Sequence, residues 1–204
     1  MESKARPHIL LIYTGGTIGM IENPETKSLE PFDFDHLIDN VPKIRMLDYD
    51  IDNIQFDCPI DSSMITPDHW RRIAEIIRDR YDRYDGFVIL HGTDTMSYTA
   101  AALSYLIQNN RKPVVITGSQ KSLAAQESDA RQNLSDAFIY ASYDGACGVH
   151  ILFDHKILLG TRSRKTRTKS FNAFQSIDFP EIGIIRNHKV IPYVTDVIHE
   201  EAPT

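Results

Sequence analysis

The chain has 204 residues, a hydrophobic content of 42% and a formal net charge of −6. These values are ordinary for a globular protein of one domain, or of one domain with a tail, and the acidic balance argues against a general nucleic-acid-binding protein. The two cysteines, Cys58 and Cys147, cannot build a disulfide framework and favour a reducing, cytoplasmic setting. We expect no signal peptide, because the apolar run near the N-terminus is too short before "TGG". We expect no membrane span, because no stretch reaches roughly 18 apolar residues.

The first half of the chain predicts two strands, a polar flap and a helix. His8–Tyr13 is a continuous apolar run, as expected of a strand buried on both faces of a parallel sheet. Residues 20–34 are polar and contain two prolines, which indicates a flap rather than a packed element. An extended strand is expected within Ile44–Phe56. Thr66-Pro67-Asp68 is typical of a helix start, and one face of the helix that follows carries Trp70, Ile73, Ala74, Ile77 and Tyr81.

The second half alternates strands with helices. Apolar runs predict strands at Gly86–Leu90, Pro113–Thr117 and Gly148–Phe153, with Lys156–Leu159 as a short partner. Amphipathic patterns predict helices over roughly 95–109 and 129–142. This alternation predicts an α/β fold with three αβα layers and a mostly parallel sheet, of the Rossmann-like or flavodoxin-like kind.

Three polar, glycine-containing turns follow predicted strands, after Tyr13, Leu90 and Ile116. The carboxyl ends of parallel strands meet at one edge of a sheet, and ligands of such sheets bind beyond that edge. We therefore expect the functional site to be built from these three turns.

The first turn, "TGGTIG", has two interpretations. Its glycines would let the backbone approach a ligand while Thr14 presents a hydroxyl nucleophile, or it is an ordinary strand-to-loop turn. The spacing does not fit a dinucleotide-binding fingerprint, and the Gly-Lys-Ser/Thr of a P-loop is absent. A phosphate- or nucleotide-binding domain therefore remains only a minor alternative.

The other motifs also have a structural interpretation beside the functional one. "HGTDTM" presents Thr93 and Asp94, which could hold an ammonium group or position a proton, although Asp94 or Thr95 could instead cap the next helix. Five basic residues fall within 162–169; most are expected on a solvated face, while one buried lysine could act as a base partner. "DSS" at 61–63 could cap a turn or bind a small carboxylate. With no second histidine at ligand spacing, His91 predicts no metal site.

Taken in order, these motifs resemble the bacterial-type L-asparaginases, and they are most similar to the cytoplasmic type I branch. The residues that carry the resemblance are "YTGGTIGM" at 13–20, "DSS" at 61–63, "YDGFVILHGTDTMSYTA" at 84–100, "VVITGSQ" at 114–120, "SDARQNL" at 128–134 and "RSRK" at 162–165. The resemblance implies an amidohydrolase that converts asparagine to aspartate and ammonia without a cofactor or a metal.

The resemblance also implies roles for individual residues. Thr14 would be the nucleophile, and Thr93, Asp94 and Lys165 would form a second catalytic set in which the lysine helps Thr93 to move protons. Asp94 would pair with the substrate ammonium, and backbone N–H groups near Gly92 and Thr93 would form an oxyanion site. The expected substrate-binding residues are Gly15, Asp61, Ser62, Ser63, Gly92, Ser119 and Gln120. Residues 20–34 would form a lid over the site.

The sequence departs from the family pattern in three places. Relatives carry a second, C-terminal domain, whereas this chain is expected to comprise an N-terminal catalytic domain over 1–190 and the start of an interdomain linker over 191–204. No tyrosine lies between 20 and 34, where many relatives supply one; Phe32 and Phe34 stand there, and Tyr13 precedes Thr14. Relatives usually have a hydrophobic residue and a proline after the glutamine, an apolar residue and an arginine further on, and a glycine in "SDG". This chain has Lys121-Ser122, Gln126-Glu127 and Ala130 at those places.

Two functional hypotheses follow. The first is an active L-asparaginase. The second is an isolated N-terminal domain, natural or engineered, that folds but has little or no activity. Relatives are homo-oligomers, and this chain is expected to be a monomer or a dimer that binds a small-molecule substrate.

Overall fold

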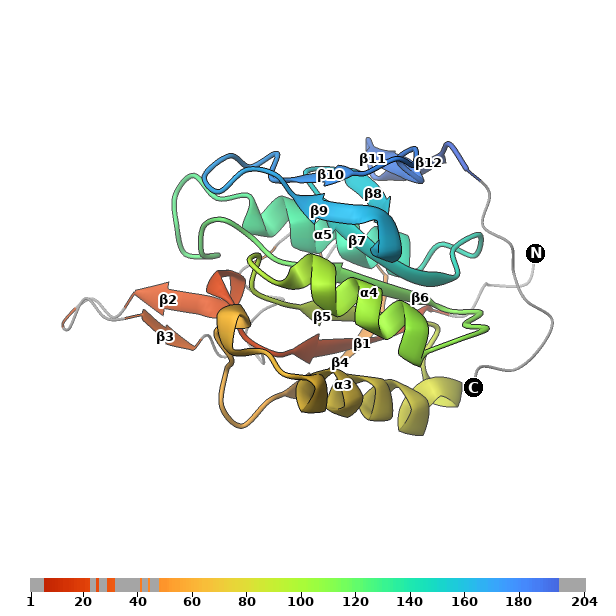
Figure 1. Ribbon diagram of the computed structural model, residues 1–204, viewed down its shortest axis with the longest axis horizontal. Coiled ribbons are helices and arrows are strands. Elements are labelled where there is room, and N and C mark those ends of the chain that lie inside the picture. Colours follow the sequence, from red (N-terminus) through yellow and green to blue (C-terminus); the bar gives the residue numbers. More distant parts are fainter. Residues whose placement is uncertain are drawn as a thin grey trace.

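The computed structural model describes residues 6–22, 25, 29–31, 41, 44 and 48–194. Its centre is an eight-stranded sheet with the order β12-β11-β8-β7-β6-β5-β1-β4 (Figure 1). Five neighbouring strands are parallel: β4 (Asp50–Gln55), β1 (His8–Tyr13), β5 (Gly86–Leu90), β6 (Pro113–Thr117) and β7 (Gly148–Phe153). The mostly parallel sheet is therefore confirmed.

The sheet continues beyond β7 with antiparallel strands. These are β8 (Lys156–Leu159), β11 (Gly183–Arg186) and β12 (Lys189–Pro192). Two further antiparallel pairs lie outside the main sheet: β2 (Met20–Glu22) with β3 (Leu29–Pro31), and β9 (Ser163–Lys165) with β10 (Phe174–Ser176). The β2–β3 pair projects from the edge where β1 ends, at the left of Figure 1.

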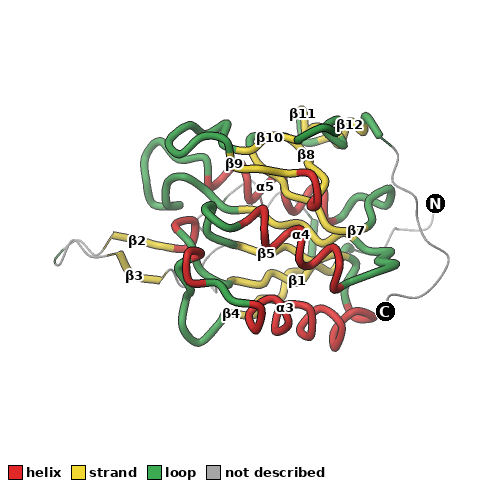
Figure 2. Tube along the Cα trace, in the orientation of Figure 1, coloured by secondary structure: helices red, strands yellow, loops and turns green. Residues whose placement is uncertain are grey.

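Within the described residues, three α-helices cover the two faces of the sheet (Figure 2). α3 (Pro67–Arg80) and α4 (Met96–Leu106) pack on one face, where Leu10 and Ile12 of β1 point. α5 (Ala130–Ala141) packs on the other, against Ile9 and Leu11. Successive residues of β1 thus enter opposite cores, which is why the strand is apolar throughout and why the three-layer prediction is confirmed.

Short 3₁₀ helices occupy several turns. They are η1 (Thr17–Gly19), η3 (Ser62–Met64), η4 (Tyr81–Arg83) and η5 (Gly160–Arg162). Within the described ranges, no helix is both long and apolar enough to cross a membrane.

The strand expected within Ile44–Phe56 is present as Asp50–Gln55, and it begins where Asp50 pairs with His8, the first residue of β1. The ends of two expected helices are wrong. The helix expected over 95–109 ends at Leu106, and Asn109 has a positive φ of 53° that a helix does not tolerate. Tyr81 belongs to η4 rather than to the preceding helix.

Two segments expected to lack packed structure contain strands. In the predicted flap, residues 20–22 and 29–31 pair as an antiparallel ribbon, whereas Phe32 and Phe34 lie outside the described residues. The linker expected over 191–204 overlaps β12, because Ile191 and Pro192 pair with Ile184 and Gly183 of β11. Residues 195–204 lie outside the described part of the chain.

Candidate active site

The turn after β1 is built around close backbone approaches. A Cβ placed on Gly15 would lie 2.2 Å from the carbonyl oxygen of Ile60, and one placed on Gly16 would lie 2.5 Å from the backbone nitrogen of Gly92. Both glycines also have a positive φ, of 139° and 90°. Only glycine meets both requirements, so the "TGG" spacing keeps this turn in contact with the turn after β5.

Thr14 lies at the base of this turn and is 2% exposed. Its backbone N–H donates to the carbonyl of Leu90 at 3.1 Å, and its hydroxyl Oγ1 donates to the same carbonyl at 2.9 Å. The structure therefore brings Thr14 to Leu90 at the end of β5, and Leu90 precedes Thr93 by three residues in the sequence. Its hydroxyl proton is engaged by a backbone acceptor.

The Tyr13 side chain is hydrogen-bonded to the backbone of the same turn. Its hydroxyl donates to the carbonyls of Gly19 at 3.3 Å and Gly16 at 3.5 Å, and a Cβ on Gly19 would lie 2.4 Å from the tyrosine ring. Burial raises the pKa of Tyr13 to about 12. Because this hydroxyl points into the loop and resists ionisation, Tyr13 holds the turn and is unsuited to activate a neighbouring nucleophile.

Thr93, Asp94 and Lys165 form a hydrogen-bonded cluster. The ammonium Nζ of Lys165 donates to Thr93 Oγ1 at 2.8 Å and to Asp94 Oδ1 at 2.7 Å. Lys165 is the last residue of β9 and pairs with Phe174 of β10, so the hairpin delivers it to the turn after β5. The lysine side chain is 14% exposed, whereas the carboxylate side chain is 68% exposed. An accessible carboxylate beside a sheltered amine is a suitable place for a cationic substrate group.

The Asp61-Ser62-Ser63 turn packs against the same loop. Asp61 accepts hydrogen bonds from the backbone N–H and the hydroxyl of Ser63, both at 2.9 Å, and these bonds lower the pKa of Asp61. A Cβ on Gly92 would lie 2.6 Å from Ser62 Oγ, and the Thr95 hydroxyl donates to the Ser62 carbonyl at 2.6 Å. The structure thus places Ser62 beside Gly92, while Ser63 is partly engaged by Asp61.

The turn after β6 carries Ser119 and Gln120. The Ser119 side chain is buried, and its hydroxyl donates to the carbonyl of Lys121. Gln120 lies close to the second threonine, since its Oε1 accepts from Thr93 Oγ1 at 3.4 Å. All three predicted turns are therefore brought to the carboxyl edge of the sheet.

His91 is buried behind the site and is 1% exposed. The Trp70 indole donates to the Thr99 hydroxyl at 2.9 Å, so the threonine proton is available to His91 Nε2, which is also 2.9 Å away. This assignment leaves Nδ1 protonated, and it donates to the Gly92 carbonyl at 2.7 Å. Burial lowers the pKa of His91 to about 4, so the imidazole is neutral near pH 7.

No metal site accompanies these residues. Among the described residues, no group of three or more His, Cys, Asp or Glu side chains is arranged to hold a metal ion.

Sequence reasoning missed the residues that support the site. Asp129, Thr95, Thr99 and Trp70 were not among the expected site residues, although Asp129 lies within the "SDARQNL" motif. Asp129 is buried, and it accepts the backbone N–H of Gln120 at 2.9 Å and that of Lys121 at 3.1 Å. An acidic residue at the start of a predicted helix is the usual pattern of a helix cap, so no sequence signal distinguishes this loop contact.

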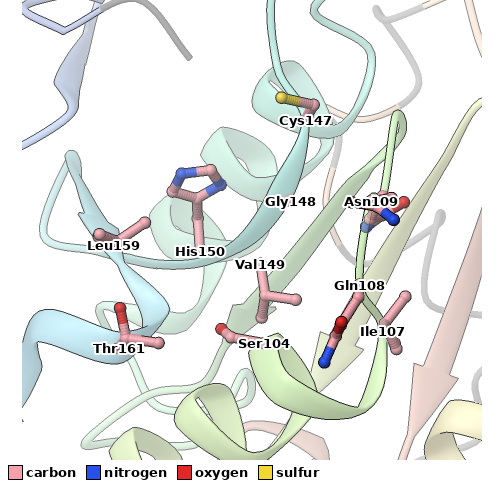
Figure 3. Close-up of a pocket in the computed structure, with 11 residues that line it drawn as sticks. Ser104, Ile107, Gln108, Asn109, Cys147, Gly148, Val149, His150, Leu159 and Thr161 are labelled. Atoms are coloured by element: carbon pink, nitrogen blue, oxygen red, sulfur yellow. The ribbon is translucent and has the colours of Figure 1, made fainter. Parts of the chain in front are cut away.

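A separate cavity of about 450 Å³ lies at the opposite, amino edge of the sheet (Figure 3). It is formed where α4 ends and β7 begins, and apolar residues such as Ile107 and Val149 line it together with the polar Gln108. Its one ionisable imidazole, His150, is held neutral by burial, which lowers its pKa to about 4. None of its lining residues is formally charged near pH 7, so this cavity offers no partner for the ammonium or carboxylate of an amino acid.

Comparison with known proteins connects the whole arrangement to one family. The chain matches the family model described as "Asparaginase, N-terminal" over residues 8–197. It is 40% identical over 177 residues to L-asparaginase 1 of Escherichia coli K12, covering 85% of this chain and 52% of that protein. The chain spans about half the length of the curated relatives it matches.

Two solved structures superpose on most of the chain. The thermostable L-asparaginase from Thermococcus kodakarensis has a TM-score of 0.89 at 34% identity, covering 96% of this chain and 59% of its own. L-asparaginase I from Vibrio cholerae has a TM-score of 0.86 at 36% identity, covering 98% of this chain and 60% of its own.

Proposed function

The chain belongs to the asparaginase family, and from this membership we propose that it hydrolyses the side-chain amide of L-asparagine to give L-aspartate and ammonia. The observation that carries the proposal is the cluster around Lys165, whose ammonium lies 2.8 Å from Thr93 Oγ1 and 2.7 Å from Asp94 Oδ1. An amine that contacts both a hydroxyl and a carboxylate can help to move protons and to hold an amino-acid ligand.

Thr14 is the proposed nucleophile. In the first step its Oγ1 would form a bond to the amide carbon, the C–N bond would break, and ammonia would leave with the proton taken from the hydroxyl. Water would then cleave the threonine ester, which releases aspartate and restores the hydroxyl. The hydroxyl donates to the Leu90 carbonyl at 2.9 Å, so attack requires it to exchange this hydrogen bond for one to a proton acceptor.

The polar groups around this position suit the two ends of the substrate. The exposed carboxylate of Asp94 would pair with the α-ammonium, and Ser62 and Ser63 would hold the α-carboxylate. Backbone N–H groups at Gly92 and Thr93 are proposed to stabilise the oxyanion. The geometry supports this arrangement because Gly92 contacts both Ser62 and Gly16, so the substrate-holding turn and the nucleophile turn share one neighbour.

The proposal is tested by measuring ammonia release from L-asparagine together with aspartate binding by calorimetry. Thr14→Ala and Lys165→Ala should abolish most of the ammonia release, while Lys169→Ala, a change of an exposed lysine in the same basic stretch, should not. Ammonia release that survives Thr14→Ala would exclude Thr14 as the nucleophile. A folded chain that neither releases ammonia nor binds aspartate would overturn the proposal and favour the inactive-domain hypothesis.

A further inference from the structure

Gln120 contacts two separate parts of the candidate site. Its amide nitrogen Nε2 donates to the carbonyls of Thr168 and Ser170, each at 3.0 Å. Its amide oxygen Oε1 accepts from Thr93 Oγ1 at 3.4 Å. Two carbonyl acceptors at one end and a hydroxyl at the other fix the orientation of the amide, because a flipped amide would place its oxygen against two carbonyls.

These contacts leave little of Gln120 for a substrate. A primary amide has two N–H donors, and both are used by backbone carbonyls. This differs from the substrate-binding role expected of Gln120 from its place in the "TGSQ" motif. The side chain instead links segments that lie 48 and 50 residues further along the chain.

The segment that Gln120 holds, residues 166–173 between β9 and β10, directly follows Lys165. Within the segment, the N–H groups of Thr166 and Arg167 donate to the Ala173 carbonyl at 2.8 and 3.3 Å, and local bonds join Arg167, Ser170 and Phe171 to residues 172 and 173. None of these bonds ties the segment to the turn after β6. A second contact joins the same two loops, since the Lys121 ammonium lies 5.6 Å from the centre of the Phe171 ring. The position of Lys165 therefore depends on how this segment is tied to the turn after β6.

The turn that carries Gln120 is itself fixed from behind. The buried carboxylate of Asp129 accepts from the backbone N–H groups of Gln120 and Lys121. Asn133 donates to the Gly118 carbonyl at 2.9 Å and accepts from the backbone N–H of Asp154 at 3.0 Å, which ties the start of the turn to the turn after β7. Gln120 thus belongs to a turn that Asp129 and Asn133 hold in place, and its side chain bonds to the 166–173 segment.

We propose that Gln120 is a positioning residue that aligns Lys165 with Thr93, rather than a substrate ligand. Its nitrogen holds the 166–173 segment in place, and its oxygen receives the Thr93 proton so that the lone pairs of Thr93 Oγ1 face the Lys165 ammonium. The catalytic consequence rests on the proposed amide hydrolysis. The structural link does not, because it stands on the hydrogen bonds of Gln120 alone.

The test separates positioning from substrate binding. Gln120→Met keeps the side-chain length but removes the amide, and Gln126→Met in the same loop, where Gln126 is exposed, is the matched control. Positioning predicts that Gln120→Met lowers kcat about tenfold or more while KM and the aspartate dissociation constant stay within about twofold, because the lost contacts do not touch substrate. A joint rise in KM and in the aspartate dissociation constant, with kcat unchanged, would overturn the proposal.

A second variant separates the two ends of the amide. Gln120→Glu keeps an acceptor for Thr93 but loses both donors to Thr168 and Ser170. We expect amide hydrogen exchange at Thr166 and Arg167 to accelerate about tenfold or more in both variants, and kcat to fall less in Gln120→Glu than in Gln120→Met.

Hydrogen exchange does not require activity, so it still decides the structural link if the wild-type chain neither binds aspartate nor releases ammonia. In that case the proposed function fails independently of Gln120. Exchange that is unchanged in both variants would refute the link itself.

Discussion

The ammonium of Lys165 lies 2.8 Å from the hydroxyl of Thr93, although 72 residues separate them in the sequence. The contact arises because β5 ends in the turn that carries Thr93, while Lys165 is the last residue of β9 and the β9–β10 hairpin presents it to that turn. Asp94 completes the group from the solvent side. The sheltered lysine can therefore exchange protons with a hydroxyl while its charge is balanced by a carboxylate that water still reaches.

Replacing Lys165 by Met should separate catalysis from stability. We expect ammonia release to fall about 10²- to 10⁴-fold, the range for loss of a proton-transfer group. The free energy of unfolding should fall by no more than about 1 kcal/mol, because Asp94 is 68% exposed and an ion pair with such a partner is screened by water. Lys169→Met is the control. A loss of activity that merely followed a loss of stability would contradict the catalytic role.

Thr14 should behave as a nucleophile whose removal hardly affects the fold. In Thr14→Val the Leu90 carbonyl still accepts the hydrogen bond from the backbone N–H of residue 14. The free energy of unfolding should therefore fall by only about 1 kcal/mol. Ammonia release should fall about 10³-fold or more. Thr14→Ser retains the hydroxyl and should keep more activity than Thr14→Val. Equal activity in both variants would show that another group attacks the amide.

The strands of the sheet were the most predictable part of this chain. β1 and β5 to β8 have the expected bounds, because strands buried on both faces read as continuous apolar runs with abrupt ends. The β11–β12 hairpin was missed. Its turn residues Asn187 and His188 both have a positive φ, at 51° and 59°, and a two-residue turn of this kind is usually signalled by glycine.

The site was predictable only to the level of its loops. Parallel strands bring the turns after Tyr13, Leu90 and Ile116 to one edge of the sheet, independently of the side chains in those turns. The location of the site could therefore be predicted from the alternation of strands and helices. The hydrogen bonds of Gln120 were not predictable, because its partners lie in an irregular segment with no periodic pattern. The same holds for the Trp70–Thr99 contact, which depends on how α3 and α4 pack against each other.

Gly16→Ala should destabilise the protein and disrupt the proposed site together. The φ of 90° at Gly16 is unfavourable for alanine, and the added methyl would lie 2.5 Å from the nitrogen of Gly92. We expect a loss of about 1–3 kcal/mol in the free energy of unfolding, measured with urea. Gly145→Ala is the control, because Gly145 is exposed and the nearest atoms belong to the Tyr143 side chain. If both variants lose the same free energy of unfolding, the backbone contact between the two turns does not restrict residue 16 to glycine.

Thr99 should matter for stability because this buried hydroxyl joins the partly buried Trp70 indole to the buried His91 imidazole. Thr99→Val keeps the shape but removes the acceptor for the Trp70 indole and the donor to His91 Nε2. Leaving a buried polar group without a partner costs about 1–3 kcal/mol, so the loss should exceed that of Thr161→Val at an exposed position. Urea unfolding measures both, and tryptophan fluorescence reports on the only indole in the chain. Equal stability of the two variants would show that the network contributes little.

Stability should fall as the solution is acidified from about pH 6.5 toward pH 4. His91 and His150 are buried as neutral rings, and burial lowers the pKa of each from 6.5 to about 4 in the folded protein. The unfolded chain therefore binds protons first on acidification. Each histidine contributes stability that is fully present above pH 6.5 and is lost as the pH falls through this window, at about 1.4 kcal/mol per pH unit where the two states differ by one proton.

Asp129 acts in the opposite direction, because burial raises the pKa of its carboxyl and protonation of this group favours the folded state.

Replacing His150 removes one of the two histidine contributions and leaves that of His91. The loss of stability on acidification should therefore become less steep without disappearing. In His150→Gln, urea midpoints measured between pH 7 and pH 4 should decline less than in the wild type, while His188→Asn, at an exposed turn, should leave the slope unchanged. An equal decline in wild type and His150→Gln would mean that His150 gains its proton without unfolding, for instance through solvent access from the neighbouring cavity.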